Sequence, residues 1–110
     1  MNSGKRAERR AAWWYRLRGY RVLERNAWVG GYELDLVVRR GRKLVFCEVK
    51  AKTGARFGTP EEMVGAEKQR RLRRAAAAWL SSHPEAAGLS VSFEVVAVDG
   101  GRLRRLAEAF

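Results

Sequence analysis

The sequence predicts an α/β domain in which a central mixed β-sheet is flanked by helices. Runs rich in β-branched residues surround Arg40-Gly41-Arg42 and have apolar residues at both alternations, which is typical of strands covered on both faces. Stretches with helical periodicity precede and follow these strands. The predicted order is helix, three strands, helix, strand, and residues 1–110 are expected to form a single domain.

The first helix is predicted from Ser3 to Arg18, and Gly19 ends it. Its apolar stripe comprises Ala7, Ala11, Trp14 and Tyr15, with Leu17 at the flank. Glu8 lies beside this stripe, so it is either a rim residue or an acid that reaches a site on the sheet. A first strand is predicted from Tyr20 to Trp28, with Val22 on its buried face.

A hairpin is predicted from the runs Tyr32–Val38 and Leu44–Val49. A tight loop at Gly41-Arg42 pairs Arg40 with Lys43 and places Asp35 directly opposite Glu48, whereas a loop at Arg40-Gly41 shifts the pairing by two. Side chains alternate with period two, so either register puts four charged residues on one face. They are Glu33, Asp35, Glu48 and Lys50. Leu34, Leu36 and Val38 are expected to share the other face with Val45, Cys47 and Val49.

Two carboxylates on adjacent strands repel each other, and a hard divalent cation would relieve this repulsion. Mg²⁺ binds one or two carboxylates and is completed by waters and substrate phosphates. Asp35 and Glu48 are therefore candidate metal ligands, and Lys50 is a candidate for orienting a water or neutralising charge. The alternative is a simple ion pair between Lys50 and one of the two acids.

After Lys50, the segment Thr53 to Pro60 is expected to be a loop that either clamps substrate or merely connects two elements. Thr59, Pro60 and Glu62 resemble a helix start. The main helix is predicted from Glu67 to Ser81, with an inward stripe of Leu72, Ala75, Ala76, Trp79 and Leu80. Gln69 either contacts substrate or water near the metal or is a capping residue. Leu89 to Val98 and Arg102 to Leu106 are predicted strands, the second at an edge.

Positive charge predicts a polyanionic partner. Lys and Arg total 23 against 12 acids, giving a net charge of +11, and nucleic acid is favoured over membrane. The alternative is a solvated, heavily charged surface. The candidate nucleic-acid-binding residues are Arg9, Arg10, Arg40, Arg42, Lys43, Lys52, Arg56, Phe57, Lys68, Arg70 and Arg71.

Several protein classes have little support in this sequence. No apolar run approaches the length of a membrane-spanning helix, and no signal-peptide core is evident, so a cytoplasmic location is expected. Cys47 is the single cysteine and is expected in the core. His83, the single histidine, is expected at the surface or at a helix cap. Among the aromatic residues, Trp13, Trp14, Tyr15 and Trp28 are expected mainly to pack, and Phe57 is the best base-stacking candidate.

The chain resembles the restriction-endonuclease-like nucleases, and most closely the YraN-like family of small bacterial proteins. The resemblance rests on segments spread over nearly the whole chain: Ala7-Glu8, Arg18–Leu23, Glu33–Leu36, Leu44–Lys50, Phe57–Glu62 and Lys68–Leu72. It implies a three-layer α-β-β-β-α-β fold. The likeness to Holliday-junction resolvases implies metal ligation by Asp35, Glu48 and the Val49 carbonyl, with Glu8 as an acid from the first helix and Lys50 as the catalytic lysine. Glu33 is a supporting acid.

The expected function is therefore a Mg²⁺- or Mn²⁺-dependent endonuclease acting on branched or otherwise structured DNA. A junction-cutting role would imply a symmetric homodimer. The alternatives are a nucleic-acid-binding module that does not cut and an interaction scaffold that retains a nuclease-like site. Tyr32 departs from the family pattern, which has Gly at that position, and is expected to narrow the approach to the site.

Overall fold

The computed structural model describes residues 3–51, 64–99, 101–107 and 110. Two helices, one short 3₁₀ turn and five strands make up the described chain. In order they are α1 (Ser3–Leu17), β1 (Arg21–Val29), β2 (Tyr32–Arg40), β3 (Lys43–Ala51), α3 (Ala66–Ser81), η1 (Pro84–Ala86), β4 (Ser90–Asp99) and β5 (Arg102–Leu106). The predicted bounds are within two residues of these, and the edge strand Arg102–Leu106 is predicted without error.

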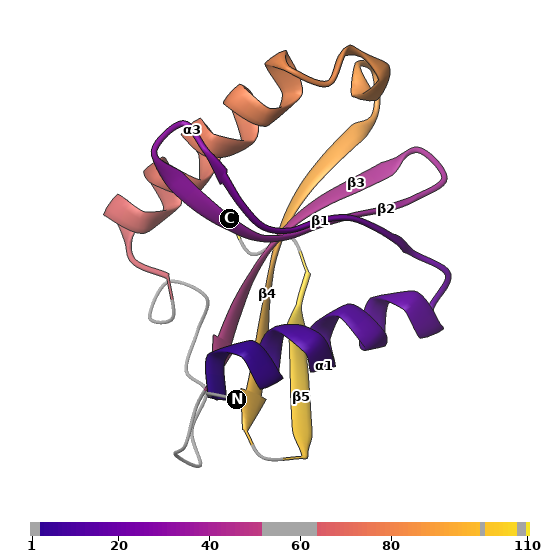
Figure 1. The fold of residues 1–110 in the computed structure, drawn as a ribbon, viewed down its shortest axis with the longest axis vertical. Coiled ribbons are helices and arrows are strands. Elements are labelled where there is room, and N and C mark those ends of the chain that lie inside the picture. The colour runs from indigo at the N-terminus through magenta and orange to yellow at the C-terminus, as the bar shows by residue number, and fades with distance from the viewer. Residues whose placement is uncertain (1–2, 52–63, 100, 108–109) are drawn as a thin grey trace.

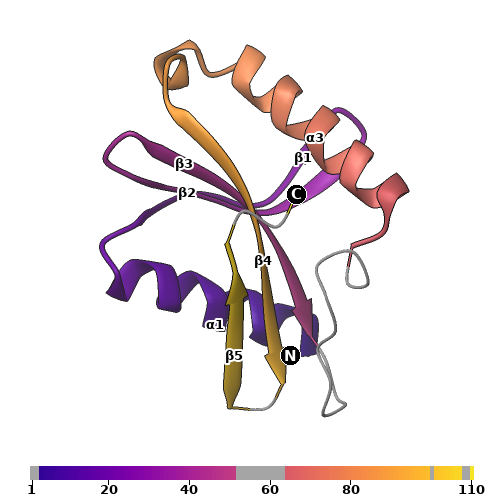
Figure 2. The same ribbon diagram turned by 180° about the vertical axis from the view of Figure 1, so that it is seen from behind.

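The strands form one mixed sheet in the order β1-β2-β3-β4-β5. Only β3 and β4 are parallel, and α3 lies in the connection between them. Helix α1 covers one face of the sheet and α3 covers the other, as both views show (Figure 1, Figure 2). The three-layer α/β architecture expected from the sequence is confirmed.

The β2–β3 hairpin has the tighter of the two predicted registers. Arg40 pairs with Lys43, and the pairing continues without a shift to Leu36 and Cys47. Gly41 has a φ of 61°, which a two-residue hairpin turn of this kind requires and which glycine adopts without strain. A local turn therefore sets which residues of β2 and β3 face each other.

Two apolar layers cover the sheet. Toward α1, the core includes Ala7, Ala11, Ala12, Tyr15, Leu36, Val38, Val45 and Cys47; toward α3, it includes Leu34, Val37, Leu44, Phe46, Leu72, Ala75, Ala76 and Trp79. The expected core position of Cys47 is confirmed. The prediction that Leu34 shares a face with Leu36 is wrong, because Leu34 packs on the α3 side.

The displacement of Leu34 has a structural cause in β2. The first half of β2 separates from β3 and continues with β1 toward α3 (Figure 1). At the β1–β2 turn, a Cβ on Gly30 would lie 3.4 Å from the Cβ of Ala78. The hairpin tip therefore packs on α3, and simple alternation along β2 fails where the strand turns away.

A buried acid links α1 to strands β4 and β5. Glu94 on β4 is fully buried and accepts a 2.6 Å hydrogen bond from the Tyr15 hydroxyl and two from the Arg105 guanidinium, at 2.8 and 2.9 Å. The Lys43 ammonium lies 3.3 Å from the same carboxylate. Burial opposes ionisation of Glu94, but the bonds from Arg105 and Tyr15 outweigh it and hold the pKa of Glu94 below its usual value.

Helix α3 begins after Gly65 and packs the predicted stripe inward. Leu72, Ala75, Ala76 and Trp79 are buried, as predicted. At its C-terminal end, the His83 ring stacks on Trp79 with centroids 3.8 Å apart, and Nδ1 lies 2.7 Å from the Trp79 carbonyl oxygen. His83 thus caps the helix, one of its two expected roles. The predicted helix start at Thr59, Pro60 and Glu62 lies outside the described residues.

Candidate metal centre

The candidate site lies where β2 and β3 part. Beyond the Leu36–Cys47 pair, the next residues are Asp35 on β2 and Glu48 on β3. The Val49 backbone N–H donates a 2.9 Å hydrogen bond to Asp35 Oδ2. A carboxylate thus replaces a neighbouring strand as the acceptor for this N–H, and the bond fixes the position of Asp35.

Three carboxylates meet at this point. One oxygen from each of Glu8 on α1, Glu33 on β2 and Asp35 on β2 lies within 4.8 Å of the other two. We call these three residues the acid cluster. Oxygens that share one Mg²⁺ or Ca²⁺ are at most about 4–5 Å apart, because each lies about 2.0–2.6 Å from the ion. The spacing therefore fits a hard divalent cation.

The electrostatics of the acid cluster favour added positive charge. Burial, followed by the nearby Glu48 carboxylate, raises the pKa of Asp35 to about 7; the Val49 N–H opposes this shift, and Glu8 and Glu33 add to it. Burial also raises the pKa of Glu8. The neighbouring carboxylates make Asp35 harder to ionise, and a divalent cation would reverse that effect.

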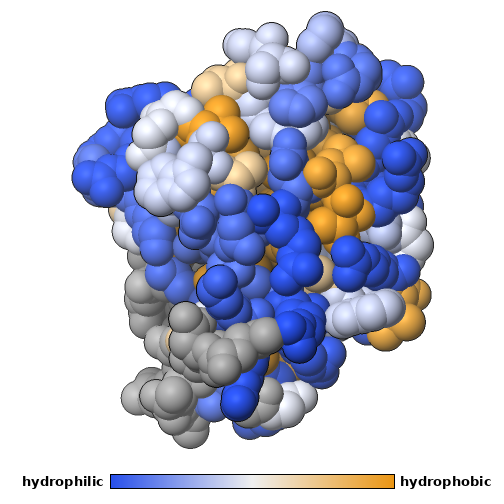
Figure 3. All heavy atoms as spheres, in the orientation of Figure 1, coloured by the Kyte–Doolittle hydropathy of each residue, from blue (hydrophilic) through white to orange (hydrophobic). Residues whose placement is uncertain are grey.

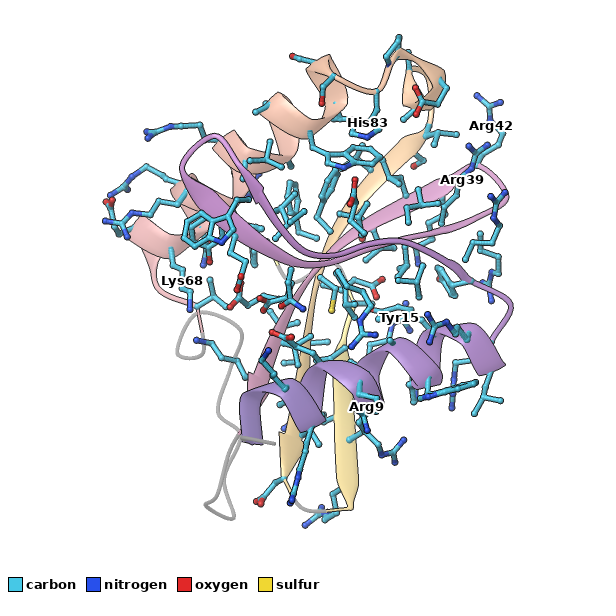
Figure 4. The ribbon with its side chains drawn as sticks, viewed as in Figure 1. Arg9, Tyr15, Arg39, Arg42, Lys68 and His83 are labelled. Carbon is cyan, nitrogen blue, oxygen red and sulfur yellow. The ribbon has the colours of Figure 1, made fainter. Side chains whose placement is uncertain are left out.

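Glu48 belongs to the neighbourhood but not to the acid cluster. Its carboxylate is buried, lies 3.2 Å from the Lys68 ammonium and accepts a 3.1 Å hydrogen bond from the Tyr32 hydroxyl. Lys68 reaches this end of the molecule from the start of α3 (Figure 4). The predicted proximity of Asp35 and Glu48 is present, but the tightest acidic group of the described chain is completed by Glu8 and Glu33.

Lys50 and Lys68 lie together beside these acids and differ in their electrostatics. Burial and the Lys68 ammonium lower the pKa of Lys50, against the opposing effect of Glu48 and Asp35. Burial also acts to lower the pKa of Lys68, but its contacts with Lys50 and Glu48 outweigh burial and leave it raised. The pair therefore offers one amine that loses its proton more readily and one ammonium that keeps its charge.

Comparisons with known proteins identify the family. Residues 7–98 match the model of the uncharacterised protein family UPF0102. The chain belongs to this family. The expected YraN-like membership is thereby confirmed, while the family's description names no activity.

Three relatives illustrate the similarity. A UPF0102 protein of Frankia alni is 51% identical over 80 residues, which are 73% of this chain and 66% of the relative. Those of Bordetella avium and Moorella thermoacetica are 43% and 46% identical, covering 97% and 81% of this chain and 73% of each relative. The chain thus spans about two thirds of the length of the Frankia relative and somewhat more of the other two.

Two predicted site residues of this UPF0102 protein have structural contacts of their own. The Gln69 side-chain amide donates a 2.8 Å hydrogen bond to the Val64 carbonyl at the start of α3. Val49 contributes its N–H to Asp35. Roles for the Gln69 amide in substrate contact and for the Val49 carbonyl in metal ligation stay predictions.

The predicted nucleic-acid-binding residues fall into separate regions. Arg40 and Arg42 at the β2–β3 turn donate hydrogen bonds to the carbonyls of Arg18 and Gly88, and Arg42 lies at the far end of the molecule from Lys68 (Figure 4). Lys43 is engaged with Glu94. These residues serve the fold at a distance from the acid cluster. Lys52, Arg56 and Phe57 lie outside the described residues.

Other cations surround the acid cluster more closely. The positive charges of Arg25 and Lys5 oppose the rise in the pKa of Glu8, and the charge of Arg71 opposes the rise in the pKa of Tyr32. Arg9 and Arg10 are exposed on α1, Arg70 and Arg71 are exposed on α3, and hydrophilic residues dominate the face seen in Figure 3. The positive charges of Lys5, Arg25 and Arg71 therefore lie close to the acids and come from α1, β1 and α3.

Asn26 is a site residue that sequence reasoning missed. It lies on β1 between the pairs Arg25–Leu36 and Ala27–Leu34, which places it opposite Asp35, and its φ is 54°. Its side chain hydrogen-bonds Glu8. Asn adopts this left-handed conformation more readily than most residues, so an isolated Asn within a strand pattern was the available signal.

The expectation that the aromatic residues mainly pack is wrong for two tryptophans. Trp13 and Trp28 are 53% and 73% exposed, whereas Tyr15 is buried and Trp14 is half-buried. Leu17, expected at the flank of the α1 stripe, is also exposed.

Neither described helix has the length and apolar character needed to cross a bilayer.

Proposed function

We propose that this protein is a divalent-metal-dependent endonuclease that hydrolyses phosphodiester bonds in branched or otherwise structured DNA. The observation that carries the proposal is the acid cluster, whose oxygens lie within 4.8 Å of one another beside Lys50 and Lys68. A group of one buried and two half-buried carboxylates, next to amines and other basic side chains, suits binding of a metal and a phosphate together.

The residues that would hold Mg²⁺ or Mn²⁺ are Glu8, Glu33 and Asp35, and Glu48 and the Val49 carbonyl are the further ligands that the family resemblance implies. When bound, such an ion polarises a phosphoryl oxygen and lowers the pKa of a bound water. Val49 N–H holds Asp35 in place, and Asn26 holds Glu8, so two of the three acids are fixed by the fold.

Lys50 and Lys68 have different roles in the proposed reaction. Lys50 has a lowered pKa, which suits an amine that accepts a hydrogen bond or proton from the attacking water. Lys68 keeps its charge beside Glu48, which suits stabilisation of negative charge on the phosphate as it develops. Tyr32 donates to Glu48 and helps to orient that carboxylate.

The substrate follows from charge and from resemblance. A net charge of +11 and a basic surface around the acids favour a polyphosphate backbone over a small phosphate ester. The choice of DNA, and of branched DNA, comes from the likeness to junction-resolving nucleases and is the part of the proposal that the experiment must decide.

A cleavage panel tests the proposal. Wild type, Asp35→Ala and the exposed control Glu85→Ala are incubated with four-way junction, flap, duplex and single-stranded DNA, and with RNA, in Mg²⁺, Mn²⁺ or EDTA. We expect wild type and Glu85→Ala to cut branched DNA with either metal, and Asp35→Ala to bind it without cutting. Equal cleavage by wild type and Asp35→Ala, in preparations free of contaminating nuclease, would refute the proposal.

A nucleic-acid-binding module that does not cut is the second candidate, and one observation favours it. The Glu48 carboxylate is already neutralised by Lys68 and bonded to Tyr32, so it has less need of a metal. This candidate predicts binding that depends steeply on salt, is unchanged by divalent metal and never leads to cleavage in the same panel.

A further inference from the structure

Among the described residues, Trp28 is the one tryptophan whose ring makes no aromatic or cation–π contact. Arg16 lies over the Trp13 ring, Arg18 lies over Trp14, and Trp79 stacks on His83. The Trp28 side chain is 73% exposed. An isolated exposed apolar residue is common, so its location has to decide whether it has a role.

Trp28 lies next to the acid cluster. On the β1–β2 ladder its direct partner is Glu33, one of the three acids. Directly opposed residues of an antiparallel pair point to the same face, with Cβ atoms about 4.5–5.5 Å apart. The indole therefore flanks the acids on the face that they occupy, close to the β1–β2 turn.

The surroundings of Trp28 suit a nucleobase. Arg25, three residues earlier on β1, is close enough to Glu8 of the acid cluster to interact with its charge. Its guanidinium could therefore bind a phosphate of the nucleotide whose base stacks on Trp28. An exposed indole offers a flat surface on which any base can stack, and Arg or Lys beside it binds the phosphates. A second protein would need a wider apolar surface than this single ring provides.

We propose that Trp28 stacks on an unpaired base of DNA next to the phosphodiester held at the acid cluster. This inference rests on the proposed function and narrows its substrate class. In a continuous duplex each base is stacked and paired, whereas a flap or branch point presents an unpaired base to the indole. The site would thus select DNA with an unpaired nucleotide at the cleavage position.

The test is a binding experiment in EDTA, so that it does not depend on cleavage. Two flap DNAs are compared: in one the unpaired nucleotides beside the branch carry their bases, and in the other these nucleotides are abasic. Wild type, Trp28→Ala, Trp28→Phe and the control Trp13→Ala are titrated, with a duplex of equal length as reference. Trp13 is also exposed but lies on α1, five residues beyond Glu8.

We expect Trp28→Ala to weaken flap binding by about 5- to 150-fold and to leave duplex binding unchanged. Trp28→Phe should retain most of the affinity, and Trp13→Ala should bind as wild type does. Removing the base beside the branch should weaken wild type by a similar factor but should cost Trp28→Ala nothing further, because the two changes remove the same contact.

Equal losses on flap and duplex, or an abasic penalty that persists in Trp28→Ala, would overturn the inference. Because wild type is tested on both base-containing and abasic DNA, the result does not depend on the variant folding normally. A Trp28-dependent base effect without cleavage in Mg²⁺ or Mn²⁺ would support stacking and overturn the endonuclease proposal. Cleavage without any base effect would overturn the stacking inference alone.

Discussion

Ionisation of Asp35 lowers the stability of the metal-free protein. Its pKa is raised to about 7 by burial and by Glu48, whereas an unfolded Asp ionises near 3.8. Between these values the unfolded chain releases its proton and the folded chain keeps it. The contribution of Asp35 to the free energy of unfolding therefore falls as pH rises from about 4 to 7, and above 7 the penalty is complete.

Replacing Asp35 by Asn should stabilise the metal-free protein while removing a proposed metal ligand. The Asn amide oxygen can still accept the Val49 N–H, but the variant has no charge to bury. We expect Asp35→Asn to exceed wild type by about 1–3 kcal/mol in urea unfolding at pH 8 in EDTA, and the difference to vanish near pH 4. A variant less stable than wild type at pH 8 would show that burial does not penalise this carboxylate.

At the scale of elements, the parting of β2 and β3 explains which parts of the site were predictable. The β2–β3 turn is local, so sequence alone limited the hairpin to two registers, and both of them bring Asp35 and Glu48 near each other on one face. Residues of β2 and β3 share predictable faces only while these two strands remain paired, and their pairing ends at Leu36 and Cys47, although β2 stays paired with β1. The side chosen by Leu34 therefore could not be predicted from periodicity.

The acid cluster itself depends on contacts between distant parts of the chain. Glu8 reaches Glu33 and Asp35 because α1 packs across β2. The residue pattern left open whether Glu8 is a rim residue or an acid that reaches the sheet, and only the family resemblance implied the second. The left-handed Asn26 and the exposure of Trp28 are likewise set by the shape of the β1–β2 hairpin. The residue types alone predicted a metal site. Which of the acids lie closest together could be seen only once α1 was packed on the sheet.

Glu94 should be a main determinant of how α1, β4 and β5 stay together. Glu94→Gln would leave Arg105 and Lys43 without a counter-charge, and we expect a loss of about 3 kcal/mol in urea unfolding at pH 7. Because the pKa of Glu94 is lowered in the fold, this contribution is present above about pH 4.5 and is lost as pH falls below that value.

Glu67→Gln is the matched control for the Glu94 substitution. Glu67 forms two ion pairs with Arg70 and Arg71 on the exposed face of α3, where solvent screens them. Its replacement should change stability little. Similar losses for Glu67→Gln and Glu94→Gln would contradict the structural role assigned to the buried acid.

At the scale of the whole molecule, positive charge is distributed unevenly with respect to the site. Arg71 lies near the Tyr32 hydroxyl, which bonds the Glu48 carboxylate beside the acid cluster. The Arg42 guanidinium instead bonds the Gly88 carbonyl at the opposite end of the molecule. Affinity for DNA should fall by about 10- to 100-fold between 50 and 200 mM salt, as expected for contact with a few phosphates.

Arg71→Gln should reduce the salt slope of DNA binding by about one, and Arg42→Gln should leave the slope unchanged. The reason is that, in the proposed binding mode, a phosphate backbone held at the acid cluster would pass α3 and would not reach the β2–β3 turn. Fluorescence anisotropy with a labelled flap DNA in EDTA measures both slopes. An equal effect of the two substitutions would place the DNA elsewhere on the molecule.

Mn²⁺ binding measured by titration calorimetry tests the central claim most directly, since every further role depends on a metal at Glu8, Glu33 and Asp35. We predict one ion per chain for wild type and for the exposed control Glu85→Gln. Glu8→Gln, Glu33→Gln and Asp35→Asn should each weaken binding by at least about tenfold. Absence of Mn²⁺ binding by wild type, or unchanged affinity in Glu8→Gln and Glu33→Gln, would contradict the acid cluster as a metal centre.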